Sequence, residues 1–159
     1  MKAFLAPILA ILIFTRCDKE ELPAAKNGKL NQDVEIALNE TLELTTNGDD
    51  NTNSGNVRVH LAELTDSRCP SNVNCIRYGS AVARLWLEKD NERSDTAELV
   101  IGEALPTDTR KLRIRSADTT LVTVDNTQYQ VILKSVLPYP CTSCPDQGEP
   151  HANIVVTEK

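Results

Sequence analysis

The sequence predicts an all-β protein, an antiparallel β-sandwich of immunoglobulin-like or related type, with a small β-barrel as the alternative. Apolar side chains recur with a period of two along most of the chain, which is the period of a half-buried strand. No stretch shows the i, i+3, i+4, i+7 recurrence of a long amphipathic helix. The short apolar runs are separated by turn-forming residues, a spacing typical of sandwiches and barrels.

Each expected strand rests on its own alternation of apolar and polar residues. The expected strands cover residues 34–38, 41–45, 57–61, 81–87, 97–101, 111–115, 119–124, 128–137 and 153–157. The run 81–87 is apolar on both faces apart from Arg84, as expected of a central strand. Residues 47–56 are all turn-forming types and predict a connection. Residues 124–129 predict a tight hairpin, because Asp and Asn tolerate left-handed turn geometry.

The start of the chain has the pattern of an export signal followed by a lipid anchor. Lys2 precedes an apolar stretch at residues 3–14, which has the length of a signal-peptide core and is too short to span a bilayer. Cys17 follows, and assigning it to a lipid such as palmitate leaves an even set of four cysteines. We expect a signal peptide at residues 1–16 and lipidation of Cys17. Ordinary cleavage after Ala25 is the alternative.

We expect three segments along the chain. After the signal peptide, residues 17–32 are polar and should form a flexible tether. Residues 33–159 suffice for a single β-sandwich domain with one core. The acidic run directly after Cys17, Asp-Lys-Glu-Glu, resembles the export tag of some outer-membrane lipoproteins. It favours a cell-envelope location in the outer membrane, facing either the periplasm or the surface.

The charge balance argues against a nucleic-acid partner. The chain has a net charge of −6, and its cations are mostly dispersed among acids rather than gathered into a basic patch. The exception is the run 110–115, where Lys111, Arg113 and Arg115 alternate with aliphatic residues. A period of two places these three cations on one strand face, and we expect that face to be solvated.

Residues 66–79 read Asp-Ser-Arg-Cys-Pro-Ser-Asn-Val-Asn-Cys-Ile-Arg-Tyr-Gly. This segment resembles small secreted bacterial lipoproteins, mostly uncharacterised, that share a D-S-R-C-P-x-x-V-x-C-x-W-x-G pattern between two strands. The resemblance covers the chain from Val34 to Pro140 and includes the run 136–140, Val-Leu-Pro-Tyr-Pro. Arg77 stands where that pattern has Trp. The resemblance implies an exported β protein with a disulfide, and it implies no established activity.

Four cysteines remain for the folded domain: Cys69, Cys75, Cys141 and Cys144. The first two enclose a short loop in which Pro70 fixes a backbone torsion, a geometry that favours a local disulfide. Crossed pairings with the second two would tie two loops together, and spacing alone leaves those pairings open. The residues of the first loop with side chains common at interface hot spots are Arg68, Arg77 and Tyr78, which we consider candidates for partner binding.

The second cysteine pair has CxxC spacing, which fits a structural bridge, a redox pair or part of a metal site. Cys141 and Cys144 lie between two prolines in a turn-rich segment, unlike the helix N-terminus that activates a redox thiolate. Because exported cysteines oxidise, we favour a disulfide. The alternative is a zinc or copper site made by Cys141, Cys144 and His151.

No known catalytic motif is present. The chain has two histidines, His60 and His151, and it lacks G-x-S-x-G, H-E-x-x-H and a phosphate-binding glycine loop. His60 lies on the polar face of its strand, where we expect an exposed or edge role. Residues 49–55 are rich in oxygen ligands but fail the EF-hand frame.

The sequence therefore predicts a protein that is not an enzyme and needs no cofactor. We expect a lipid-anchored cell-envelope protein with a binding or accessory role, whose partner is an envelope protein or a small ligand. The main alternative is an exported metal-binding protein that uses Cys141, Cys144 and His151. A hydrolase based on carboxylates is a more remote alternative.

Overall fold

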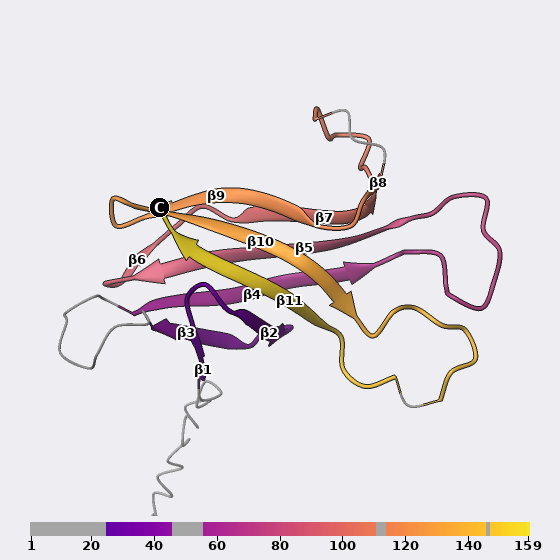
Figure 1. Cartoon of the computed structure of the whole chain (residues 1–159), viewed down its shortest axis with the longest axis horizontal. Coiled ribbons are helices and arrows are strands. Elements are labelled where there is room, and N and C mark those ends of the chain that lie inside the picture. Colours follow the sequence, from indigo (N-terminus) through magenta and orange to yellow (C-terminus); the bar gives the residue numbers. More distant parts are fainter. Residues whose placement is uncertain (1–24, 46–55, 111–113, 146) are drawn as a thin grey trace, which may run out of the picture.

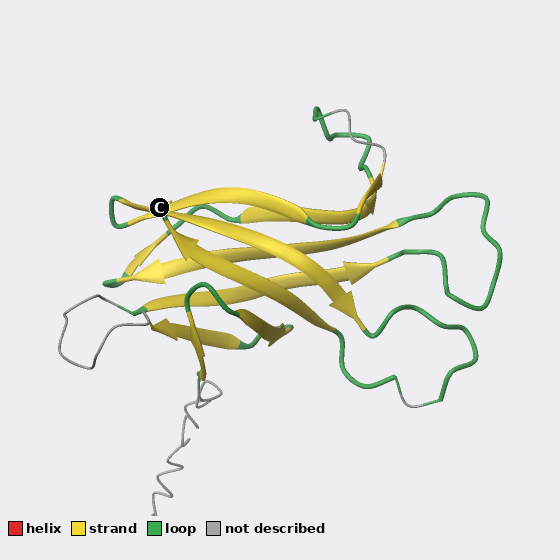
Figure 2. Ribbon diagram, in the orientation of Figure 1, coloured by secondary structure: helices red, strands yellow, loops and turns green. Residues whose placement is uncertain are grey.

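Alternating apolar side chains build two β-sheets that pack face to face in a computed structural model of the chain (Figure 1). The structure describes residues 25–45, 56–110, 114–145 and 147–159. The expected signal peptide, Cys17 and most of the connection at 47–56 lie outside the described residues. Every regular element of the described chain is a strand, and no helix in it is long and apolar enough to cross a membrane (Figure 2).

The strands follow the predicted alternation closely. They are β1 (Lys26–Lys29), β2 (Asp33–Ala37), β3 (Thr41–Thr45), β4 (Val57–Asp66), β5 (Ser80–Lys89), β6 (Glu92–Arg93), β7 (Ala97–Glu103), β8 (Ile114–Arg115), β9 (Asp118–Val124), β10 (Thr127–Leu137) and β11 (His151–Glu158).

The strands form a large and a small sheet. The large sheet has the order β1-β3-β4-β5-β7-β8, with β6 paired to β5, and the small sheet has the order β2-β11-β10-β9. All pairings are antiparallel except that of β1 with β3, which is parallel. Both sheets are open, so the sandwich prediction is confirmed and the closed barrel is not formed.

The core lies between the sheets and is supplied by every second residue of each long strand. In β5 the inward residues Ala81, Ala83, Leu85 and Leu87 are fully buried, and in β11 Ala152, Ile154 and Val156 are too. Tyr129 of β10 is among the largest fully buried side chains. Full burial of one Leu, Ile or Val side chain stabilises the folded state by about 1.5–3 kcal/mol, so this layer dominates the stability of the sandwich.

The expected tether is wrong in its second half. β1 pairs with β3, and the next residue, Leu30, is only 3% exposed and belongs to the core. The backbone N–H of Asn31 then donates to Val156 O at 2.9 Å, so the chain passes from the large sheet to the small one. The pattern Lys-Asn-Gly-Lys has no apolar side chain to predict a strand; backbone pairing and the burial of Leu30 fix it. The folded domain therefore begins no later than Lys26 rather than at residue 33.

The two ends of the sandwich differ in their connections. One end carries the short hairpin turns, including Asp125 and Asn126 with φ of 46° and 55°, which confirms the hairpin predicted at residues 124–129. The C-terminus also lies there (Figure 1). Two long connections, 67–79 between β4 and β5 and 138–150 between β10 and β11, extend together from the opposite end (Figures 1 and 2). We call these two segments the loop end.

Candidate binding site at the disulfide loops

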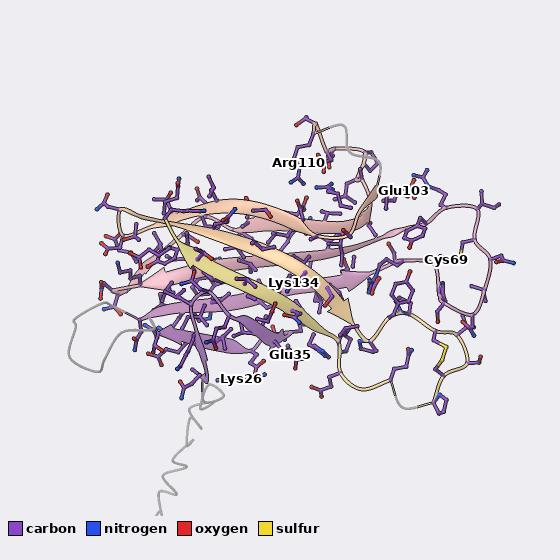
Figure 3. The ribbon with its side chains drawn as sticks, viewed as in Figure 1. Lys26, Glu35, Cys69, Glu103, Arg110 and Lys134 are labelled. Atoms are coloured by element: carbon purple, nitrogen blue, oxygen red, sulfur yellow. A yellow bond between two sulfur atoms is a disulfide. The ribbon has the colours of Figure 1, made fainter. Side chains whose placement is uncertain are left out.

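Each loop of the loop end is closed by its own disulfide. Cys69 is bonded to Cys75, and Cys141 to Cys144. The local pairing that we favoured is the one formed, and the crossed pairings are not. Both disulfides lie on the side of the molecule where the loops project (Figure 3). Short closed loops have fewer conformations than open ones, so each disulfide restricts how its loop can move.

Hydrogen bonds join the two loops to each other, although no disulfide does. The backbone N–H of Ser71 donates to Pro140 O at 2.9 Å. The Asn72 side chain accepts from the Thr142 backbone N–H at 3.1 Å and donates to the Thr142 and Ser143 hydroxyls at 2.9 Å. The two loops therefore form one surface. Sequence reasoning missed Asn72, because nothing in its neighbourhood indicates a partner some 70 residues away.

Gly79 closes the first loop where it enters β5. Its φ is +72°, and a Cβ at this position would lie 2.0 Å from the backbone oxygen of Ser67. The Ser67 hydroxyl donates to Ser80 O at 2.9 Å, and Cys69 N donates to Tyr78 O at 2.7 Å, so the two stems of the loop are paired. Only glycine fits this close approach, which gives a physical reason for the glycine that ends the 66–79 motif.

The prediction that Arg68 binds a partner is wrong, because Arg68 is buried and fully occupied within the protein. Its guanidinium donates to Asp66 at 2.5 Å and to the backbone oxygen of Val136 at 2.6 Å. It also lies over the ring of Tyr139, with Cζ 4.3 Å from the centroid. Arg68 is therefore a structural link between the end of β4 and the end of β10. This role explains both charged residues of the D-S-R motif.

Arg77 and Tyr78 remain accessible, as a binding role requires. Arg77 Nη2 donates to Glu103 Oε1 at 2.5 Å, and Glu103 Oε2 also accepts from Gly79 N at 3.2 Å. The hydrogen bond from Arg77 is the main reason that the pKa of Glu103 lies below its ordinary value. Tyr78 is half exposed. Burial raises the pKa of neighbouring Tyr139, and a hydrogen bond with Tyr78 adds to the increase.

Apolar side chains are exposed on the same loops. Ile76, one residue from Arg77, is fully exposed, and Val73 and Tyr78 are close to half exposed. Leu137, at the base of the second loop, is 40% exposed. Large apolar side chains held in water at the tip of a restrained loop indicate an interaction surface. The sequence signal for Ile76 is weak: it is an isolated apolar residue in a run of turn-forming and charged residues.

The proposed metal site is not formed. The sulfurs of Cys141 and Cys144 are bonded to each other, whereas a metal ligand must be a free thiolate. The His151 ring nitrogen Nδ1 lies 3.1 Å from the backbone oxygen of Glu149. In the described ranges no three His, Cys, Asp or Glu side chains are grouped as metal ligands would be. The calcium-like run 49–55 lies outside the described residues.

His60 is not an exposed edge residue but part of a stack on the outer face of the large sheet. Its ring lies 3.7 Å from that of Trp86 at an interplanar angle of 6°, and Arg93 lies over the Trp86 ring at 4.2 Å. His60 also contacts Thr41 Oγ1 at 3.0 Å and Glu88 Oε2 at 3.1 Å. Burial lowers the pKa of His60, although Glu88 opposes the shift. The cluster stacks side chains across β4, β5 and β6, so its role is structural.

The expected solvated face at 111–115 is wrong for Arg115; Lys111 and Arg113 lie outside the described residues. Arg115 is buried and paired with Asp108 and Asp118. Arg110, labelled in Figure 3, donates to Asp118 Oδ1 at 2.6 Å. Burial opposes ionisation of Asp118, yet hydrogen bonds from Arg110 and from the backbone of Val100 outweigh it and lower the pKa. The cluster joins β7, β8 and β9, which makes it structural.

Comparison with known proteins adds nothing to this geometry. No protein family matches the chain, and neither the curated proteins nor the solved structures contain a significant match.

Proposed function

We propose that the protein is a lipid-anchored cell-envelope protein with a non-enzymatic binding or accessory role, and that the loop end is its binding surface. The observation that carries the binding role is the joined pair of disulfide-closed loops, which holds Ile76, Val73 and Tyr78 in water. Apolar side chains in this setting lose contact with water when a partner covers them, and that loss favours association.

The restraint of the loops supports the same role. Disulfides, the hydrogen bonds between the loops and the contacts of Arg68 fix the backbone before any partner arrives. A surface that is already ordered loses less conformational entropy on binding, so more of the contact energy appears as affinity. Since the loops project from the sandwich, a protein of the envelope is the favoured partner over a small ligand, whose sites are concave (Figure 1).

Cysteine usage supports export and anchoring. The four cysteines of the described domain form two disulfides, which persist in oxidising compartments such as the periplasm or the cell surface. Cys17 is then the one cysteine of the sequence without a disulfide role, and it follows the signal-like run 3–14. The acidic residues after Cys17 favour an outer-membrane location, facing the periplasm or the surface.

Intact mass tests the anchor. The protein is purified from its native membrane and its mass is measured before and after alkylation without reduction. We expect an acylated chain that begins at Cys17 and takes up no alkylating agent. A chain that begins after Ala25 and lacks acyl groups would rule out the anchor, and alkylation at Cys141 and Cys144 would rule out the second disulfide.

The size of the native complex tests the binding role. Detergent-extracted wild-type protein is compared with Ile76→Asp by native electrophoresis. Asn126→Asp is the control, since it adds the same charge in the exposed hairpin turn at the opposite end of the sandwich. We expect a larger complex for the wild type and for Asn126→Asp, and its loss for Ile76→Asp. Identical migration of all three proteins would contradict binding through the loop end.

A further inference from the structure

The two outer strands of the small sheet expose very different edges. The free edge of β2 is closed by side chains: Lys26 Nζ donates to Glu35 O at 3.1 Å, and Ala37 N donates to Glu40 Oε2 at 2.8 Å (Figure 3). Asp33 of the same strand pairs with Lys134 at 2.8 Å. Charged side chains and occupied backbone groups at an edge prevent another strand from adding to it. The edge of β2 is therefore protected.

The opposite edge, β9, has almost none of these features. From Thr119 to Val124 it contains no charged residue and no proline, and its pairing with β10 is regular, without a bulge. The side chains that face outward are Thr119, Leu121 and Thr123, and Leu121 is 56% exposed. A flat, uncharged edge with an exposed aliphatic residue is the kind that pairs with another strand.

The backbone of β9 is oriented to accept such a strand. The two-residue turn after Val124 makes Val124 and Thr127 a hydrogen-bonded pair, and these pairs alternate along the hairpin. The N–H and C=O groups of Leu121 and Thr123 therefore point away from β10. The small sheet ends at β9, so in the described part of the chain they have no strand to pair with. The Thr119 N–H already donates to Asp118 Oδ1 at 3.0 Å, so at Thr119 only the C=O group can bond to an added strand.

Space is available beside this edge. β7 and β9 run along the same side of the two sheets (Figure 1), and two adjoining grooves of about 610 and 410 Å³ follow the gap between them. Both grooves are lined by Glu98, Thr120 and Leu121. The facing edge of β7 is partly closed, because Val100 N donates to Asp118 Oδ2 at 2.8 Å and Glu98 is paired with Arg84. The open edge is that of β9.

We propose that β9 pairs with β9 of a second copy of this chain, antiparallel and related by a two-fold axis at Leu121. The outward sequence Thr119, Leu121, Thr123 is symmetric about Leu121, so Leu121 opposes its counterpart and Thr119 opposes Thr123 of the second copy. Threonine pairs are favourable cross-strand neighbours, and two opposed leucines remove apolar surface from water. Because an isologous contact uses the same patch twice, this symmetry is what a two-fold interface requires.

Charge does not oppose a second copy at this edge. The chain carries a net charge of −6, so two copies repel each other wherever acids face acids. The run from Thr119 to Val124 is uncharged, which lets two acidic molecules approach there without direct repulsion. A stable protein complex buries roughly 1,200–2,000 Å² of surface, and one pair of strands buries less than that. We therefore expect a weak dimer that depends on concentration.

Sedimentation equilibrium over a range of protein concentrations tests the dimer. We expect the wild type to dimerise as concentration rises and Leu121→Lys to remain monomeric, since the substitution places two lysines opposite each other at the axis. Thr65→Lys is the matched control, because Thr65 is exposed on β4, an inner strand of the large sheet, and it should dimerise like the wild type. A monomeric wild type, or dimerisation of Leu121→Lys equal to that of the wild type, would overturn the proposal.

Engineered cysteines test the register in a chain whose Cys17 is replaced by Ser. Opposed residues of a hydrogen-bonded pair have Cα atoms about 5.5 Å apart, within the range of a disulfide. Leu121→Cys should form a covalent dimer under mild oxidation. Thr119→Cys alone should not, since its two copies would be about 13 Å apart along the strands, but it should link to Thr123→Cys when the two variants are mixed. Linkage of Thr119→Cys to itself, or none at Leu121→Cys, would overturn the two-fold axis at Leu121.

Discussion

Gly79 and Arg68 are the residues on which the loop end depends most directly. Gly79 has a positive φ and lies against the backbone of Ser67, while Arg68 joins the ends of two strands that belong to different sheets. For each of them the chain contains a residue of the same type in a different environment: Gly148 for Gly79, and Arg77 for Arg68. That allows the local cause to be separated from the general cost of a substitution.

We predict that Gly79→Ala destabilises the fold much more than Gly148→Ala. Both glycines have a similar positive φ, +72° and +74°, so both substitutions incur the left-handed strain of about 1–2 kcal/mol. Nothing lies within 4 Å of a Cβ at Gly148, whereas Gly79 has the Ser67 oxygen at 2.0 Å. We expect at least ~2 kcal/mol of further loss for Gly79→Ala by urea denaturation. Equal losses would show that the contact with Ser67 does not restrict the site.

Arg68→Met should lower the free energy of unfolding by about 3 kcal/mol, because it leaves the Asp66 carboxylate and the Val136 oxygen without their shared donor. Arg77→Met removes an exposed ion pair with Glu103 and should change stability little. Denaturant unfolding of both variants checks the difference. If the two changes are similar in size, Arg68 does not have the structural role assigned to it.

At the scale of the strands, the stack of His60 on Trp86 predicts how stability depends on pH. Burial lowers the pKa of His60, so the unfolded chain binds a proton at higher pH than the folded one. Stability should fall as pH drops from 7 through about 6.5 toward the lower pKa of the folded state. The charged groups that face the ring are Glu88, which opposes the shift, and Arg58 and Arg93, which add to it.

Replacement of His60 separates this effect from the contribution of the other titratable groups. His60→Gln should flatten the decrease in stability between pH 7 and pH 5. Urea unfolding at a series of pH values makes the measurement. An undiminished slope in His60→Gln would assign the pH dependence to other groups.

The strands were largely predictable, because a strand that is buried on one face has alternating apolar and polar residues. β1 was not, since it has no apolar side chain and its place is set by pairing with β3. The cysteine pairs were predictable from spacing. The burial of Arg68 was not, because its acceptor at Val136 is 68 residues away along the chain. Isoleucine is ordinarily buried, so the sequence did not predict that Ile76 is exposed. The exposure follows from the positions of the two loops in the fold.

At the scale of the whole molecule, the sandwich separates two surfaces. The loop end carries disulfide-closed loops with exposed apolar side chains, and the side edge carries the uncharged strand β9. A partner at the loop end and a second copy at β9 would occupy different parts of the molecule, so both could bind at once. Substitutions at Ile76 and at Leu121 should therefore act independently.

Photo-crosslinking in the native membrane tests the binding role of the loop end most directly. A photoreactive amino acid is placed at Ile76 and, as the control, at Asn126 in the exposed hairpin turn at the opposite end of the sandwich. Binding through the loop end predicts a discrete crosslinked product from position 76, no such product from position 126, and its loss when Cys69 and Cys75 are both replaced by Ser. No product from position 76, or the same product from both positions, would contradict it.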